Sequence, residues 1–162
     1  AFTDLLPMTD EMGEQCVETY RRLFNENNAL YVIPTFPNVM ETLHQLHEQG
    51  YTLTIASSRS NRSLREFVND MDLNEVIPYV LGAEDVAHAK PHPDPVLQTL
   101  ESFSCKPEDA LVVGDTWYDI EMGRRAGVRT CGVTYGNGSR EELMRAGADY
   151  LIDDFGELVK II

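Results

Sequence analysis

The segment that most constrains the fold is residues 110–127, ALVVGDTWYDIEMGRRAG. Its first four residues are apolar and two of them are β-branched, which is typical of a short strand buried on both faces of a parallel sheet. The glycine that follows lets the backbone turn, so that Asp115 falls at the end of the strand. Thr116 is a suitable N-cap for a helix that Gly127 would end, and Asp119 lies in the first turn of that helix.

This placement of Asp115 and Asp119 allows two interpretations. Two carboxylates at the end of a strand and in the next helical turn could share a hard divalent cation, directly or through its waters. An aspartate that directly follows a buried strand is also often only a helix cap. The segment by itself is compatible with both interpretations.

Segments of strand and helix character alternate along the rest of the chain. By their apolar, β-branched and aromatic content, the expected strands are residues 51–56, 79–82, 110–113, 130–133 and 150–152. Helical spacing and capping signals predict helices that begin near Thr9 or Asp10, Pro37, Asn61, Pro95, Trp117, Ser139 and Leu158. A linker over residues 27–34 would separate the first helix from the others. The alternation predicts an α/β fold with a parallel sheet and right-handed crossovers.

Composition limits the partners that this chain can have. Its 162 residues suffice for one domain with a substantial core. The formal charge of −14 would repel nucleic acid and anionic lipid, so neither is expected as a partner. A small phosphorylated molecule is still compatible with this charge, because a local cation can offset the overall field.

Other sequence features indicate a cytoplasmic protein. No apolar run approaches the roughly 20 residues that a membrane span needs, and no signal-peptide pattern is present at the start. The three widely spaced cysteines (Cys16, Cys105 and Cys131) are expected to be reduced and structural. The four histidines show no metal-ligand spacing, and His44 and His47, on one expected helix, are interpreted as partly solvated.

Polar residues follow the expected strands, where the carboxyl ends of a parallel sheet collect ligands. They are Ser57, Ser58, Arg59, Lys90, Asp115 and Asp119. Helix N-terminal amides and a hydroxyl suit a phosphate oxygen, a lysine suits phosphate as a point charge, and paired acids suit Mg²⁺. Taken singly, Ser57 is more often a helix cap and Lys90 more often a solvated lysine. Together, at one edge of one sheet, they predict phosphate chemistry.

Three short motifs carry a resemblance to a known family. They are LTIAS at residues 53–57, KPHP at 90–93, and GDTWYD at 114–119 followed by AG at 126–127. Over residues 31–162 the chain resembles the haloacid dehalogenase superfamily of aspartate-nucleophile phosphatases, and most of all its phosphoglycolate phosphatase-like branch. The resemblance implies a three-layer, Rossmann-like parallel sheet with helices on both faces.

One family motif is absent from this sequence. The first motif, Asp-x-Asp-Gly-Thr, ends the central strand of the family's sheet and supplies both the nucleophile and the general acid and base. Nothing near the start of this chain replaces it. We therefore expect the sequence to be a fragment, with residues 1–30 the end of an inserted helical cap and residues 31–162 the core without its first strand. We also expect the fragment alone to be inactive.

The resemblance implies roles for the remaining motif residues in the whole enzyme, which would hydrolyse a small phosphorylated metabolite through an aspartyl-phosphate. Asp115 and Asp119 would serve the Mg²⁺ site, Ser57 and the Ser58 amide would hold phosphoryl oxygens, and Lys90 would balance the crowded charges. Arg59 could reach the leaving group or lie on the surface. The substrate's identity and the oligomeric state are not predicted.

Three alternatives stay open at this point. A phosphomutase of the same superfamily would share these core motifs. A non-catalytic interaction protein could keep the fold without the nucleophile. A receiver domain also places acids, a hydroxyl and a lysine at strand ends, but the position of Lys90 before Asp115 disfavours that class.

Overall fold

The computed structural model describes residues 7–28 and 34–162, in two compact units that divide between Thr35 and Phe36. In the described part of the first unit, helix α2 (Asp10–Asn28) begins where the sequence predicts, and the backbone amide of Met12 donates a hydrogen bond to the Thr9 hydroxyl at 3.3 Å. Most of the expected linker lies outside the described residues. No helix within the described part of the chain is long and apolar enough to cross a membrane.

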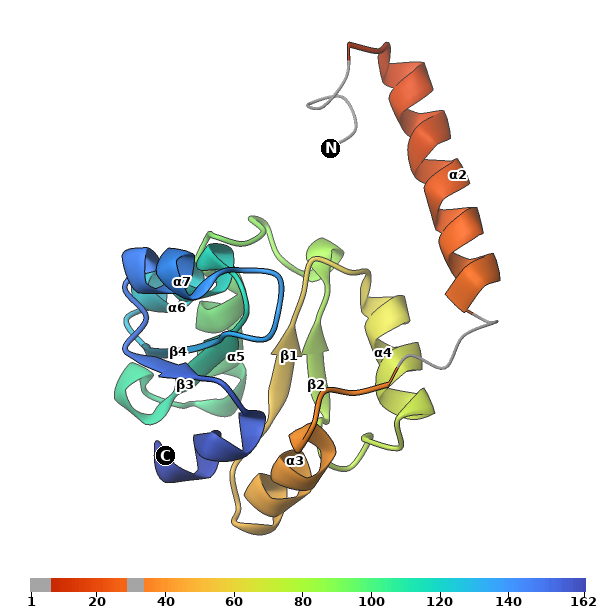
Figure 1. Ribbon diagram of the computed structural model, residues 1–162. Helices are drawn as coiled ribbons and strands as arrows, with labels where there is room; N and C mark the ends of the chain where they lie inside the picture. The colour runs from red at the N-terminus through yellow and green to blue at the C-terminus, as the bar shows by residue number, and fades with distance from the viewer. Residues whose placement is uncertain (1–6, 29–33) are drawn as a thin grey trace. The chain divides into compact units, whose positions relative to one another are not determined.

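The second unit alternates strands and helices (Figure 1). Its strands are β1 (Thr54–Ala56), β2 (Tyr79–Leu81), β3 (Leu111–Gly114), β4 (Arg129–Val133) and β5 (Tyr150–Ile152). Its α-helices are α3 (Val39–Glu48), α4 (Asn61–Asp70), α5 (Asp94–Phe103), α6 (Trp117–Ala126) and α7 (Arg140–Ala146). Three 3₁₀ turns complete it: η1 (Ala83–Asp85), η2 (Pro107–Asp109) and η3 (Phe155–Lys160).

The strands form two parallel sheets rather than one. β1 pairs with β2, and β3, β4 and β5 pair in that order. β1 and β3 are therefore both edge strands, each with a hydrogen-bonded neighbour on one side only among the described residues. The parallel α/β class predicted from the sequence is confirmed.

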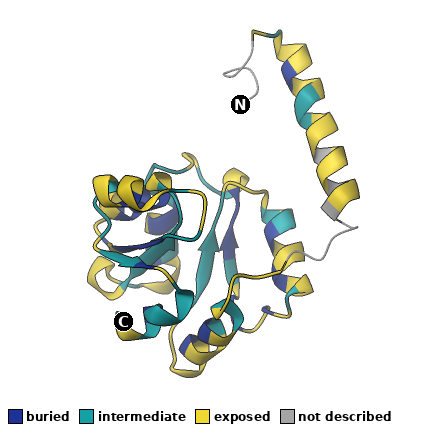
Figure 2. Cartoon of the chain, viewed as in Figure 1, coloured by how far each residue is buried: buried dark blue, intermediate teal, exposed yellow. Residues whose placement is uncertain are grey.

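Helices cover the sheets and enclose three apolar clusters, whose buried residues appear dark blue in Figure 2. One cluster joins α4 to β2, and it includes Leu64 and Val80. A second places Leu46 of α3 against β4, β5 and η3. A third packs α5 against α6, through Leu100 and Met122. Because these clusters lie on both sides of the strands, the fold is layered as the sequence predicts.

Several capping signals fix helix ends as expected. Gly127 and Gly147 end α6 and α7 in the left-handed conformation, with φ values of 77° and 82°. The Ser139 side chain accepts a hydrogen bond from the Glu142 amide, and the Glu142 carboxylate accepts one from the Ser139 amide at 2.9 Å. This reciprocal pair is the capping box that the sequence predicts.

Two expectations about strands are corrected by the structure. The strand expected over 51–56 is only Thr54–Ala56. The strand expected to be buried on both faces, β3, is partly exposed at every one of its residues. Residues of both strands line the same cavity.

Candidate active site

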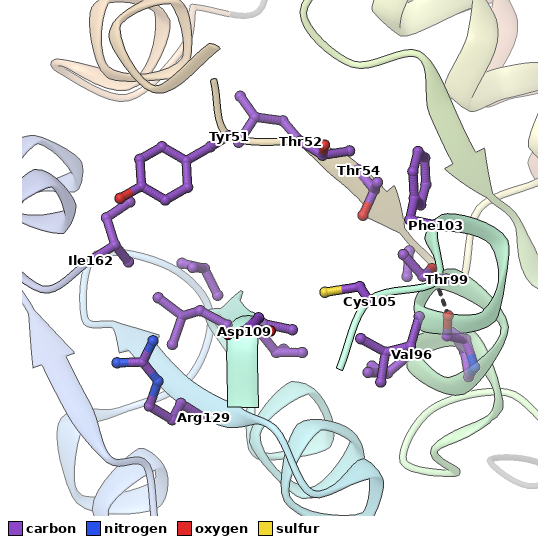
Figure 3. A pocket seen from close by; sticks show the side chains of 18 of the residues that line it. Tyr51, Thr52, Thr54, Val96, Thr99, Phe103, Cys105, Asp109, Arg129 and Ile162 are labelled. Atoms are coloured by element: carbon purple, nitrogen blue, oxygen red, sulfur yellow. Dashed lines mark hydrogen bonds between the residues drawn. The ribbon is translucent and has the colours of Figure 1, made fainter. Parts of the chain in front are cut away.

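A cavity of about 820 Å³ lies between β1 and β3. Figure 3 shows Thr52 and Thr54 on its β1 side, Phe103 of α5 beside Thr54, Val96 of α5 farther from them, and Arg129 on the opposite wall. Much of the lining is apolar, and it includes Leu46, Leu53, Ala56, Leu100, Leu111, Val112, Val113 and Met122. Lys90 and Asp119 also line it, so two predicted site residues face the same space as the two free strand edges.

Lys90 and Asp119 form a short, largely buried ion pair. The Lys90 Nζ atom donates a hydrogen bond to Asp119 Oδ1 at 2.7 Å. The two side chains are only 19% and 8% exposed. A contact between residues 29 positions apart requires the loop before α5 to fold back onto the start of α6. Lys90 is therefore not the solvated surface lysine of the alternative interpretation.

The second oxygen of Asp119 caps the start of helix α6. Asp119 Oδ2 accepts hydrogen bonds from the Thr116 hydroxyl at 2.7 Å and from the Thr116 amide at 3.1 Å. Burial raises the pKa of Asp119, but the Lys90 ammonium and the hydrogen bonds from Lys90 and Thr116 outweigh it, so that the pKa lies below its ordinary value. Asp119 is therefore an ionised carboxylate with partners at both oxygens.

Asp115 directly follows β3 and is held by the loop after β4. Its Oδ2 atom accepts hydrogen bonds from the Asn137 amide at 2.8 Å and from Asn137 Nδ2 at 3.0 Å, and its carbonyl accepts one from Gly138 at 2.9 Å. A Cβ at Gly136 would overlap the Asp115 side chain. Within the described residues, Asp115 Oδ1 accepts no hydrogen bond, so one carboxylate oxygen has its lone pairs available.

The residues after β1 form a turn rather than a helix end. The Ser57 hydroxyl accepts a hydrogen bond from the Arg59 amide at 3.2 Å. Helix α4 begins later, with Ser60 as its N-cap. The alternative in which Ser57 caps the helix is therefore wrong, and Ser57 and Ser58 lie in the loop between β1 and that cap.

Arg59 is directed toward helix α4. Its guanidinium donates to Ser63 Oγ at 2.6 Å and lies 5.8 Å from the centre of the Phe67 ring. Of the two roles considered for Arg59, these contacts favour the surface role.

One cluster of chemically active side chains has no counterpart in the sequence predictions. His88, His92 and Asp94 each offer a ligand atom, and these atoms lie within 4.8 Å of one another. The statement that the histidines lack metal-ligand spacing is therefore wrong for this pair. Two histidines four positions apart, with an aspartate two positions after the second, are the sequence signal that could have revealed this cluster.

The lowered pKa of Asp119 has a consequence for stability. A carboxyl group whose pKa is lower in the folded chain stabilises the fold above its unfolded pKa of about 3.9, and this contribution is lost as the pH falls through the folded pKa. Asp119→Asn removes the titrating group and most of the charge-assisted bond to Lys90. We expect it to lower the free energy of unfolding at about pH 6 by about 1.5–3 kcal/mol.

The measurement is urea unfolding of the parent and of Asp119→Asn between about pH 6 and about pH 2. The difference between the two should shrink as the pH falls. Asp70→Asn is the matched control, because Asp70 is exposed at the end of α4 and forms no ion pair among the described residues. A difference that is independent of pH would show that Asp119 does not stabilise the fold as a carboxylate.

Comparison with known proteins agrees with this fold. Residues 4–133 match the family of haloacid dehalogenase-like hydrolases. The pyrophosphatase PpaX of Anoxybacillus flavithermus is 32% identical over 152 residues, which are 94% of this chain and 70% of that protein. The PpaX proteins of two Bacillus cereus strains are 32% identical over 149 residues, or 92% of this chain and 68% of each.

Solved structures of related proteins also have this fold. A predicted phosphoglycolate phosphatase from Haemophilus somnus has a TM-score of 0.86 at 28% identity, over 95% of this chain and 68% of that one. A predicted phosphatase from Clostridium acetobutylicum has a TM-score of 0.84 at 26% identity, over 99% of this chain and 74% of that one. The fold is therefore the Rossmann-like α/β fold that the motifs imply.

The chain belongs to the haloacid dehalogenase-like hydrolases, as its match over most of its length shows. Within them it resembles the phosphoglycolate phosphatase-like proteins. The predicted class of enzyme, a phosphoric monoester hydrolase, agrees with the names of these relatives.

Proposed function

We propose that this chain is most of the catalytic core of a cytoplasmic, Mg²⁺-dependent phosphatase that hydrolyses a small phosphorylated metabolite. The observation that carries the proposal is the Lys90–Asp119 pair, which lines the cavity between β1 and β3. Ser57 follows β1 and Asp115 follows β3, so the hydroxyl and the second carboxylate lie at the carboxyl ends of the two strands that border this cavity.

The cavity indicates where the strand that carries the absent first motif would lie. β1 and β3 run parallel to their own neighbours and each has a free edge beside the cavity. One parallel strand between them would lie about 4.8 Å from each and would join the two sheets into one. We propose that a strand ending in Asp-x-Asp-Gly-Thr occupies this space, which would place its aspartates beside Lys90 and Asp115.

The donor set around Asp115 fits a hard cation. One of its oxygens is held by Asn137 and the other accepts no hydrogen bond among the described residues, which is suitable for a metal-binding carboxylate. Mg²⁺, when bound, would neutralise charge on the phosphoryl group. Both oxygens of Asp119 already have partners, so Asp119 would support the site through Lys90 and through metal-bound waters.

The other residues would bind and orient the phosphoryl group. The hydroxyl of Ser57 and the amide of Ser58 would donate to its oxygens. The Lys90 ammonium would stabilise the negative charge in the transition state, held in position by Asp119. The first-motif aspartate would attack phosphorus in line, and water would hydrolyse the resulting aspartyl-phosphate. The names of the relatives reported above favour hydrolysis over the mutase alternative.

The test is the Mg²⁺ dependence of an Asp115→Asn variant, made in a protein that contains the first-motif strand. Removing one negative charge from the metal site should weaken Mg²⁺ binding, so the Mg²⁺ concentration for half-maximal kcat/KM should rise at least about tenfold. Activity should recover in part at high Mg²⁺, because mass action refills a weakened site.

Asp72→Asn provides the control for this substitution. Asp72 is exposed and has a φ of 56°, which asparagine adopts as readily as aspartate. This variant should keep the parent's Mg²⁺ dependence. If Asp115→Asn also keeps it, the cation binds elsewhere and Asp115 only orders the loop after β4.

A further inference from the structure

His88, His92 and Asp94 form a compact group on the loop that precedes and begins helix α5. The Nδ1 atom of His88 lies 2.8 Å from Asp94 Oδ2, and the His88 amide donates to the same oxygen at 3.1 Å. The Nδ1 atom of His92 lies 2.8 Å from the other oxygen, Oδ1. The two imidazole rings face each other, with centres 4.4 Å apart. Two ring nitrogens and one carboxylate therefore converge on the same small space.

The contact of His92 with Asp94 is not a hydrogen bond. Among the described residues, the buried His92 Nδ1 atom accepts or donates no hydrogen bond, and its 2.8 Å contact with Asp94 Oδ1 is an ion pair only when the ring is protonated. A buried ring nitrogen without a partner normally loses free energy, because its hydration is not replaced. A cation between the nitrogen and the oxygen would satisfy both atoms at once.

We propose that His88, His92 and Asp94 bind a divalent transition-metal ion of the Zn²⁺ type. Two imidazoles and one carboxylate are a ligand set that zinc accepts, with a fourth position left for water. Mg²⁺ is disfavoured at this group, because it prefers oxygen ligands and nitrogen donors suit zinc, nickel and copper. The strongly negative chain, at −14, would also attract a divalent cation.

This group is chemically separate from the proposed Mg²⁺ site, although the same loop connects them. Lys90 lies between His88 and His92 in the sequence, and its Nζ reaches Asp119. Asp94 is the first residue of α5. A metal ion held by residues on both sides of Lys90 would therefore fix the backbone of the Lys90 loop against the start of α5.

Metal binding to this chain is measurable without any enzymatic assay. Titration of the purified chain with Co²⁺ should produce the visible absorption of a cobalt ion with nitrogen and oxygen ligands. It should not produce a thiolate-to-cobalt charge-transfer band, because none of the three cysteines belongs to the group. Zn²⁺ should displace the cobalt at a ratio of one ion per chain, and calorimetry with Zn²⁺ alone should give the same ratio.

His88→Ala and His92→Ala should each weaken Zn²⁺ and Co²⁺ binding by at least about tenfold, since loss of even a supporting group around a metal costs 10–100-fold. The matched control is the double variant His44→Ala with His47→Ala, which removes the other two histidines, both exposed on α3, and should leave binding unchanged. Far-ultraviolet circular dichroism would confirm that each variant keeps the parent's helix content.

Three results would overturn the proposal. They are a parent chain that binds neither ion, binding that His88→Ala and His92→Ala leave intact, and cobalt spectra with a thiolate band. In each case His88 would be only an ion-pair partner of Asp94. The proposed phosphatase function does not depend on these results, because the titration reads neither Mg²⁺ binding nor turnover.

Discussion

Residues 1–162 by themselves should give no measurable turnover of p-nitrophenyl phosphate at any Mg²⁺ concentration. The proposed mechanism needs an in-line nucleophile, which the first-motif aspartate would supply, and the two carboxylates of the GDTWYD motif have structural roles of their own. Asp119 caps the start of α6 and forms an ion pair with Lys90, and Asp115 accepts a hydrogen bond from the Asn137 side chain. Covalent catalysis is therefore absent, and the remaining groups would only bind phosphate. The measurement is steady-state hydrolysis by the purified chain, with inorganic phosphate binding as evidence of an intact pocket.

The matched comparison is a chimaera to which a strand ending in Asp-x-Asp-Gly-Thr has been added. It should be active, and replacement of the first aspartate of that motif by asparagine should abolish the activity again. Two results would contradict the proposal. One is Mg²⁺-dependent turnover by residues 1–162 alone, which would require a nucleophile within this chain. The other is an active chimaera whose activity survives the asparagine substitution.

Lys90→Ala should lower kcat/KM of the active protein by about tenfold to a hundredfold or more, and added Mg²⁺ should not restore it. A charge-assisted hydrogen bond contributes about 1.5–3 kcal/mol, which corresponds to this range of rates. The buried position of Lys90 makes the loss larger than at the surface, because its charge is poorly screened by solvent. The measurement is kcat/KM against Mg²⁺ concentration.

Lys106→Ala is the matched control for this charge change. The Lys106 side chain is 73% exposed and approaches Glu108 only at 3.9 Å, so its removal should leave kcat/KM unchanged. Equal effects of the two variants would mean that Lys90 acts only through the overall charge of the protein. Recovery of Lys90→Ala at high Mg²⁺ would instead place its role in cation binding.

Much of the second unit could be predicted from local sequence. Thr116 and Gly127 delimit α6, and Ser139 begins α7. These signals are reliable because a cap acts on amides and carbonyls within one turn, whatever the rest of the fold does. The gathering of Lys90 and Asp119 was also predictable, because the loops after parallel strands meet at one sheet edge.

The remainder depended on contacts between distant segments. β1 is shorter than its apolar run suggests, because a strand extends only as far as a neighbour pairs with it, and β2 pairs with three residues. The convergence of His88, His92 and Asp94 depends on the path of the loop, which no periodicity encodes. Ser60 rather than Ser57 caps α4 because Ser57 is used in a local turn with Arg59.

One carboxylate oxygen of Asp119 accepts a hydrogen bond from Thr116 in its own helical turn, and the other accepts one from Lys90, which is 29 residues away in the sequence. The position of the Lys90 ammonium is therefore set by helix α6. A small rotation or shift of α6 would move the ammonium together with the helix. The Lys90 loop and helix α6 would then move together. An exchange of the Lys90 loop between relatives would keep the charge in place only if the receiving helix begins with the same Thr-x-x-Asp pattern.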